Sequence, residues 1–245
     1  MPNNLHRNQE YFSERRSVFS SSNLPEQLKT YKKGSLMRTL SFIGLNEYEG
    51  TLVDFGSNDS ALGKLLLNSK YQSKIEQIIS VDVENRTPDF FTDKLHFLLI
   101  DNLYRVDLPN ESVDFIFFRY SLHHMTFDIQ LLVLKEAYRI LKPHGKLIII
   151  EDTFSLINEA IFNNNFCQVF SRFCDNSCKM ILSMLDASSC FIYDETMPFS
   201  FSFRSIEEWI DILTNIGYLE KSVKYWGVTF SSLFVAPMGI MQYEK

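Results

Sequence analysis

The chain has 245 residues, of which 45% are hydrophobic, enough to bury a substantial core in one domain with an elaboration. Its formal net charge of −6 disfavours nucleic acids and anionic membranes as partners, since both are bound mainly through clustered lysine and arginine. No apolar run approaches the ~18 residues of a membrane span, and residues 1–8 lack the apolar core of a signal peptide. We therefore expect a cytoplasmic protein with a small-molecule partner.

The chain opens with residues 1–50, which are predicted to be helical, with aromatic side chains among arginine, lysine and glutamate. An apolar run from Leu52 follows and breaks into a turn of small residues before the helical pattern of residues 61–67. This pattern predicts a strand, a tight loop and a helix start. In an open α/β sheet, ligands bind beyond the carboxyl end of such a strand.

The loop itself indicates which ligands fit. A dinucleotide-binding loop has three glycines, but here only Gly56 is present, with Asn58 and Ser60 in the other two places. Asparagine tolerates the left-handed conformation, so the turn can form, although a pyrophosphate would be crowded. Asp54 would also repel a phosphate and suits a ligand with an ammonium or sulfonium charge.

Strand-like runs alternate with helical or turn-rich segments through the centre of the chain, as in a parallel doubly wound sheet. The runs cover residues 51–55, 78–83, 95–100, 113–118 and 146–151. A helix is predicted over residues 128–141, ending at Pro143-His144-Gly145. A second helix follows Ser205, which forms a capping-box spacing with Glu208, and stops at Gly217. Two further strands are expected at 221–226 and 232–243, which gives a seven-stranded, mostly parallel α/β sheet.

Between Asp152 and Arg204 lies a long insertion that contains nine of the 22 phenylalanines. We expect a folded helical cap over the carboxyl end of the sheet, with the rings forming either its own core or a pocket wall. All four cysteines also fall here, but they lack the close C-x-x-C pairs of zinc sites. They are predicted to be reduced thiols, and no metal site is expected.

Four short motifs occur in a fixed order between about residues 52 and 152. They are VDFGSND at 53–59, SVDV at 80–83, IDN at 100–102 with LPNESVDF at 108–115, and YSLHHM at 120–125 with LKPHGK at 141–146. Each motif alone is weak, but the order and the intervals are specific. On these motifs the chain resembles the class I S-adenosylmethionine-dependent methyltransferases of the small-molecule (type 11) kind, although two loop glycines are absent.

The resemblance implies a Rossmann-like methyltransferase fold and S-adenosylmethionine as cofactor. The first motif would contact the methionine moiety and the ribose of the cofactor. The second motif would contact the ribose, and the third would contact the adenine. The end of the fourth strand would present its backbone to the cofactor. The residues implied are Asp54, Gly56, Ser57, Asn58, Asp82, Val83, Asp101, Asn102, Phe118 and Arg119.

Methyl transfer from a sulfonium is an in-line displacement, so alignment and exclusion of water are the main requirements. A hydroxyl acceptor also benefits from a base, and His123 or His124 is the first candidate. Relatives with different acceptors carry the same pair, which leaves a loop-shaping role open. Glu151 and Asp152 are second candidates, or else helix caps. Asp114 is expected to be structural, because it opens its strand at the opposite end of the sheet.

The resemblance also suggests a division of the chain into a lid (1–50), a cofactor-binding core (51–152), a substrate cap (153–204) and a closing segment (205–245). The expected acceptor is a small, apolar or aromatic metabolite, with oxygen slightly favoured as the methylated atom. Residues expected near it are Tyr11, Phe12, Glu151, Phe154, Phe162 and Phe166, with Phe170, Phe173 and Phe191 also in the cap.

Two other functions remain open at this point. A methyltransferase-like protein that has lost catalysis and serves as a binding partner is supported only by the two missing glycines. A nicotinamide oxidoreductase is disfavoured by Asp54 and by the absence of the same two loop glycines. The acceptor and the oligomeric state are not determined by the sequence.

Overall fold

The computed structural model describes residues 48–69, 72–85, 92–155, 174–193, 202–226 and 238–245. The predictions that concern Tyr11, Phe12, Phe162 and Phe166 lie outside these residues, as do those for Phe170 and Phe173. Among the helices that the structure describes, none has the length and hydropathy of a membrane span.

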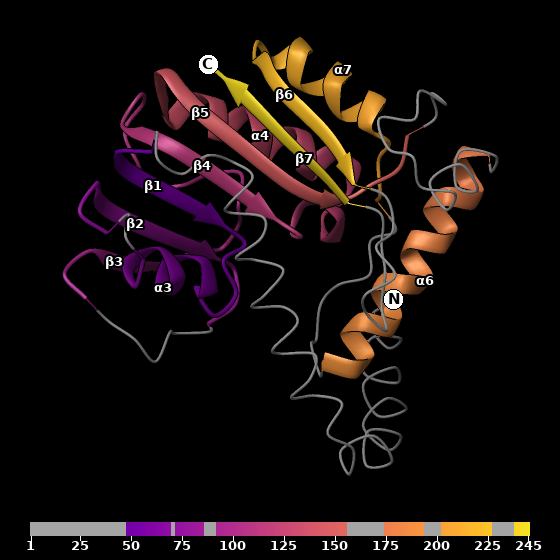
Figure 1. The fold of residues 1–245 in the computed structure, drawn as a ribbon, viewed down its shortest axis with the longest axis horizontal. Helices are drawn as coiled ribbons and strands as arrows, with labels where there is room; N and C mark the ends of the chain where they lie inside the picture. The colour runs from indigo at the N-terminus through magenta and orange to yellow at the C-terminus, as the bar shows by residue number, and fades with distance from the viewer. Residues whose placement is uncertain (1–47, 70–71, 86–91, 156–173, 194–201, 227–237) are drawn as a thin grey trace.

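A seven-stranded sheet forms the centre of the molecule, with strand order β3-β2-β1-β4-β5-β7-β6 (Figure 1). The strands from β3 to β5 are parallel to one another, and β7 runs antiparallel to both β5 and β6. The predicted doubly wound, mostly parallel sheet is therefore confirmed. The strands are β1 (Gly50–Phe55), β2 (Ile75–Asp82), β3 (Leu95–Leu99), β4 (Val113–Arg119), β5 (Leu141–Asp152), β6 (Leu219–Trp226) and β7 (Met238–Glu244).

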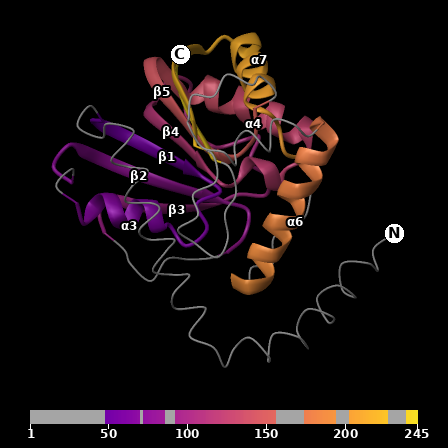
Figure 2. The same cartoon turned by 45° about the vertical axis from the view of Figure 1, so that its right-hand side comes forward.

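Helices cover both faces of this sheet. One core packs α4 (Phe127–Ile140) and α7 (Ile206–Ile216) against one face, and a second core packs α3 (Ala61–Leu67) against the other. The strands serve both cores because alternate side chains point to opposite faces, with Val53 and Phe55 in the first core and Leu52 in the second. The helix α6 (Asp175–Tyr193) stands beyond the carboxyl ends of the strands (Figures 1 and 2).

The local signals for helix ends are largely confirmed. Ser205 and Glu208 form the reciprocal capping box at the start of α7, and Gly217 ends that helix with φ of 116°. The α4 helix ends at Ile140, and β5 begins at once, earlier than expected. Pro143-His144-Gly145 falls inside β5, where the pairing with β4 is irregular. The chain leaves the helix early because a proline cannot continue a helix and disfavours helical geometry in the residue before it.

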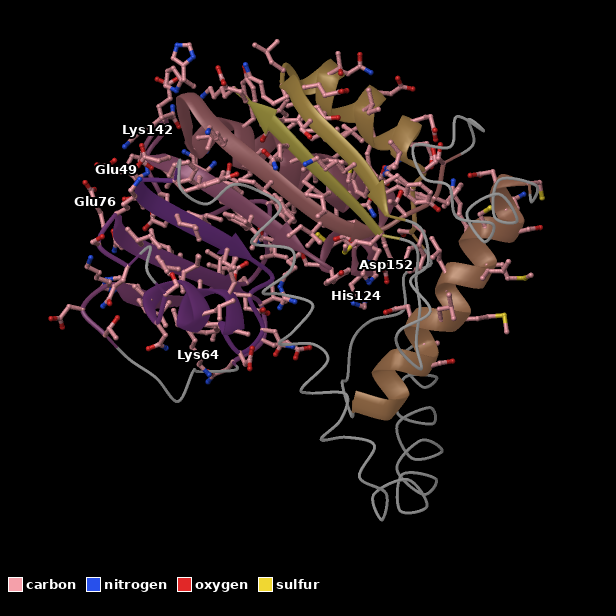
Figure 3. The ribbon with its side chains drawn as sticks, in the orientation of Figure 1. Glu49, Lys64, Glu76, His124, Lys142 and Asp152 are labelled. Atoms are coloured by element: carbon pink, nitrogen blue, oxygen red, sulfur yellow. The ribbon has the colours of Figure 1, made fainter. Side chains whose placement is uncertain are left out.

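Asp114 ties three strands together at the amino end of the sheet. Its Oδ2 accepts a hydrogen bond from Thr51 N at 2.9 Å, and Lys142 Nζ donates to its Oδ1 at 2.8 Å. A Cβ on Gly50 would lie 2.4 Å from the same Oδ2. Lys142 lies at the end of the sheet opposite His124 and Asp152 (Figure 3). This geometry agrees with the structural role expected for Asp114.

Replacing Asp114 by alanine should lower the free energy of unfolding by about 1–3 kcal/mol, because Thr51 N–H and the Lys142 ammonium both lose their partner. Urea denaturation measures the change. Asp211→Ala, on the exposed side of α7, is the control and should change little. An unfolding free energy that is the same in both variants would contradict the proposed tie.

Candidate active site

The carboxyl ends of β1, β2, β4 and β5 lie along one edge of the sheet. The strand order reverses between β1 and β4, because the chain adds β2 and β3 on one side of β1 and then β4 and β5 on the other. Ligands of open α/β sheets bind outside the carboxyl ends at such a reversal. This edge is therefore the candidate site, and it has two parts, one around β1 and β2 and the other around β4 and β5.

The loop after β1 forms a tight turn without the usual three glycines. Asn58 and Ser60 adopt left-handed conformations, with φ of 51° and 58°. Gly56 also has a positive φ, and a Cβ there would lie only 2.7 Å from the Cβ of Ser121. Glycine is thus required at this one position, while asparagine and serine take the left-handed places at a modest energetic cost.

Asp82 holds this loop against the end of β2. Its Oδ2 accepts from Asn58 N at 2.7 Å, and its Oδ1 accepts from Glu84 N at 3.0 Å. The structure thus brings together Asp82 and Asn58, two residues predicted independently for the cofactor site. Each carboxylate oxygen retains a second lone pair, so Asp82 can accept further hydrogen bonds from a ligand.

Asp54 is a buried carboxyl at the end of β1, with 3% of its surface exposed. Burial raises its pKa to about 7, the Arg119 guanidinium lowers it, and the neighbouring carboxylates of Asp82 and Asp59 raise it. A positively charged ligand would stabilise the ionised form of Asp54. This part of the edge therefore favours a cation, as the sequence predicted.

Several buried oxygens in this region have no hydrogen-bond partner among the described residues. They include Ser57 Oγ in the loop and Asn102 Oδ1 after β3, and Ser60 Oγ and Ser80 Oγ lie near the same loop. Buried polar atoms are normally paired, so a ligand with hydroxyl and amino groups fits this part of the site. Asp101, beside Asn102, is exposed.

Apolar surface is exposed at two neighbouring strand ends. Val83 follows β2 and is 46% exposed, while Leu99 ends β3 and is 49% exposed. Phe118, by contrast, is fully buried and stacks on Phe55 with ring centroids 4.9 Å apart. Phe118 therefore has only its backbone to offer a ligand at the edge, and Arg119 is partly exposed there.

Glu151 organises the second part of the edge from beneath. Its Oε1 accepts from Ser121 N at 2.8 Å and from Leu122 N at 2.7 Å, and its Oε2 pairs with His123 Nδ1. It is completely buried. Glu151 was expected near the acceptor; in the structure both of its oxygens contact residues 121–123.

The same turn, the 3₁₀ helix η2 (Leu122–His124), is held from the other side by Gln130 of α4. Its Nε2 donates to Leu122 O at 3.0 Å and to Ser202 O at 2.8 Å, and its Oε1 accepts from Arg204 Nε at 2.6 Å. The sequence did not predict this link, since Gln130 occupies an ordinary helical position and its partners are distant in the chain.

The two predicted catalytic histidines face Asp186 of α6. His123 Nε2 lies 3.5 Å from Asp186 Oδ1, and His124 Nδ1 lies 4.0 Å from its Oδ2. Burial by itself lowers the pKa of His123, but the carboxylates of Glu151 and Asp186 raise it well above 6.5. A protonated ring cannot accept a proton, so His123 is poorly suited as a base, while His124 is partly exposed.

Asp152 completes this part at the end of β5. Burial raises its pKa to about 7, where His123 opposes the shift and Glu151 and Asp186 add to it. Asp152 and His124 lie at the same edge of the sheet, on the side of α6 (Figure 3). Asp186 was missed by the sequence analysis, because it carries no motif and meets the histidines only through the fold.

Phe154 was predicted to line the acceptor pocket but is fully buried. It packs with Cys178, Leu182 and Phe203 in a small core beneath α6, so it forms the interior of the insertion. Cys174 and Cys178 are free thiols, in agreement with the prediction of reduced cysteines.

Comparisons with known proteins were made for sequence and for structure. Residues 53–149 match the family model described as a methyltransferase domain. No curated protein matches the sequence significantly.

Three solved structures illustrate the structural similarity. A putative sarcosine dimethylglycine methyltransferase from Galdieria sulphuraria has a TM-score of 0.60 at 13% identity, covering 90% of this chain and 87% of its own. An S-adenosylmethionine-dependent methyltransferase from Archaeoglobus fulgidus has a TM-score of 0.58 at 16% identity, and the alignment covers 96% of this chain and 100% of that one. The 1,6-didemethyltoxoflavin-N1-methyltransferase from Burkholderia thailandensis has a TM-score of 0.58 at 14% identity, and the alignment covers 97% of this chain and 89% of that one.

At these identities the structural neighbours show the fold, and the family match adds the activity. S-adenosylmethionine also fits the edge around β1 and β2, where a cationic group would meet Asp54 and polar groups would meet the unpaired oxygens of Ser57 and Asn102. Residues 53–149 of this chain therefore match the methyltransferase domain family, and the activity that this match indicates is S-adenosylmethionine-dependent methyl transfer, with S-adenosylmethionine as the cofactor.

Proposed function

We propose that the protein methylates a small, largely apolar or aromatic metabolite and that the favoured acceptor atom is an oxygen. The observation that carries the proposal is the division of one sheet edge into two polar groups. One, around Asp54 and Asp82, suits the cofactor, and the other, around His124 and Asp152, lies where an acceptor would approach. Two structural neighbours are named for methylation of small molecules, which supports a small-molecule acceptor but not its apolar character or its oxygen atom.

When bound, S-adenosylmethionine would supply an electrophilic methyl group: the acceptor would bond to the methyl carbon in line as the carbon–sulfur bond breaks and the sulfur leaves as a neutral thioether. Asp54 would face the positive charge of the methionine moiety, and Asp82 would accept from the ribose hydroxyls while it keeps Asn58 N–H in place. Asn102 would meet polar atoms of the adenine. Val83 and Leu99 would offer exposed apolar surface to its ring. These residues bind and orient, which is the larger part of catalysis for this reaction.

The acceptor side supports oxygen because a hydroxyl must lose a proton during transfer. His124 and Asp152 lie at this edge, and the η2 turn that carries His124 is fixed by Glu151 and Gln130. The name of the Burkholderia neighbour assigns a nitrogen acceptor to that protein. The preference for oxygen in this chain rests on its own polar cluster.

The hypothesis of a binding protein without activity depended on the two missing glycines. Asn58 and Ser60 adopt the left-handed conformations that glycines would supply, so the loop forms despite the substitutions. The structure thus removes the physical reason for a disabled cofactor loop, and the enzyme proposal is favoured.

Asp82→Ala should weaken S-adenosylmethionine binding by about 1.5–3 kcal/mol, because a charged acceptor is lost and Asn58 N–H loses its partner. Isothermal titration calorimetry measures the affinity. Glu76→Ala, an exposed change at the opposite end of the same strand, should leave it unaltered (Figure 3). Equal affinities in a folded Asp82 variant and in the control would remove Asp82 from the cofactor site.

The affinity for S-adenosylmethionine should rise with pH up to about 7 and then level off. Below that pH the Asp54 carboxyl is protonated and must release its proton to meet a cation, which costs about 1.4 kcal/mol per pH unit. Asp82, Asp59 and Arg119 surround this carboxyl and set its pKa. Calorimetry between pH 5.5 and 8 tests this, and Asp54→Asn should flatten the rise. A flat profile in the unmodified protein would show that Asp54 does not face the charge.

His124→Ala should retain cofactor affinity but lose about 10²- to 10⁴-fold in turnover, if the imidazole takes part in removing the acceptor proton. A panel of phenols and other small hydroxyl compounds provides the substrate, and single-turnover measurements isolate the chemical step. His144→Ala, an exposed histidine at the opposite end of β5, is the matched control. Turnover that survives in the His124 variant would leave alignment alone as the source of catalysis.

A further inference from the structure

Two elements that are distant in the sequence place three metal-ligating side chains together. One ring nitrogen of His123, one of His124, both from the η2 turn, and one carboxylate oxygen of Asp186 from α6 all lie within 4.8 Å of one another. The individual separations from Asp186 are 3.5 Å and 4.0 Å. Ligand atoms of a tetrahedral site with bonds of about 2.0–2.1 Å are separated by about 3.4 Å, so small inward movements would complete such a site.

The next layer of contacts has the form that metal sites commonly show. Glu151 Oε2 pairs with His123 Nδ1, which leaves Nε2 facing Asp186. Metal-binding histidines usually donate their other nitrogen to a carboxylate, which fixes the tautomer and the ring orientation. Glu151 is itself held by the backbone N–H groups of Ser121 and Leu122. The first ligand is therefore held in position before any ion binds.

The charge balance also favours a cation. The carboxyl groups of Glu151, Asp152 and Asp186 lie close enough to interact electrostatically with His123 or with one another. Each neighbouring imidazole can carry no more than one positive charge. Carboxylates gathered in a largely buried place repel one another unless a positive charge lies between them. A divalent ion in contact with Asp186 would relieve this repulsion.

We propose that His123 Nε2, His124 Nδ1 and Asp186 bind a divalent transition metal ion, with Zn²⁺ as the representative case. Two imidazoles and one carboxylate suit zinc, iron or nickel, whereas magnesium and calcium prefer oxygen ligands alone. The sequence analysis did not predict this site, because Asp186 is distant from the adjacent histidines in the chain and meets them only in the folded structure. Three protein ligands leave at least one coordination position open, as in catalytic zinc sites.

The function of the ion rests on the proposed methyl transfer. The open position would take the acceptor oxygen and lower the pKa of its hydroxyl, so that the proton leaves to solvent. The oxygen then forms a bond to the methyl carbon as the sulfur–carbon bond breaks. The electron pair of that bond remains on sulfur as a neutral thioether, so charge and atoms balance.

Zinc binding to the chelator-treated full chain, without cofactor, tests the site. Titration with ZnCl₂ should show one saturable site per chain. Asp186→Asn and His124→Gln should each weaken zinc binding at least about tenfold. Even the loss of a residue that only hydrogen-bonds to a metal ligand typically lowers metal affinity by about 10- to 100-fold. Asp211→Asn and His144→Gln, which make the same chemical changes on exposed surface away from the cluster, should bind zinc as the unmodified chain does. Thermal unfolding confirms that each variant is folded.

Cobalt substitution provides a readout of geometry. Co²⁺ held by two imidazoles and a carboxylate should give intense visible absorption bands typical of four-coordination, and Asp186→Asn should abolish them. Glu151→Gln, which keeps the size of the side chain, should weaken zinc binding about tenfold by loosening His123. Absence of a saturable zinc site, or zinc binding equal in Asp186→Asn and Asp211→Asn, would overturn the proposal.

The same measurements separate this site from the proposed function. Cofactor affinity in Asp186→Asn should be unchanged, because the cofactor residues lie around β1 and β2. Zinc binding that depends on Asp186, in a chain that methylates no hydroxyl compound, would support the site and contradict the proposed acceptor. Turnover that is unaffected by chelator treatment, in a chain without a zinc site, would contradict the metal and leave His124 as a base.

Discussion

The buried carboxylate of Glu151 is the interaction on which the part of the edge around β4 and β5 depends. It accepts two backbone hydrogen bonds from the turn after β4 and pairs with His123, so one side chain at the end of β5 fixes the orientation of the next element. A carboxylate without these partners would be expensive to bury. The turn and the carboxylate therefore require each other, and the histidines are held rigidly before any ligand binds.

At two places along one edge of the sheet, burial raises a carboxyl pKa to about 7, and neighbouring carboxylates add to the shift. Asp54 belongs to the cluster at β1 and β2, and Asp152 to the cluster at β5. Each cluster is unfavourable on its own, because buried like charges repel. A positive charge relieves that repulsion in both places. The same constraint thus explains a cationic cofactor on one side and the proposed metal ion on the other.

The two parts of the edge depend on different regions of the chain. The cofactor side is built by the sheet and by the loop after β1, where Asp82 and Asn58 meet directly. The acceptor side also requires the insertion, since α6 supplies Asp186 and Gln130 links η2 to residues 202–204. The fold that this chain shares with neighbours at 13–16% identity supplies the first part, while the second also depends on the insertion.

The sequence by itself determined the sheet, the helix caps and the cofactor loop. These depend on local patterns, such as the apolar runs of the strands and the capping box at Ser205, which residue spacing alone expresses. The tertiary structure alone decided the roles of Glu151, Gln130 and Asp186. Glu151 was expected near the acceptor, but its contacts with residues 121–123 were not, and Asp186 belongs to no motif. Their roles come from contacts between segments far apart in the chain, and no local pattern encodes which distant carboxylate will meet a given imidazole.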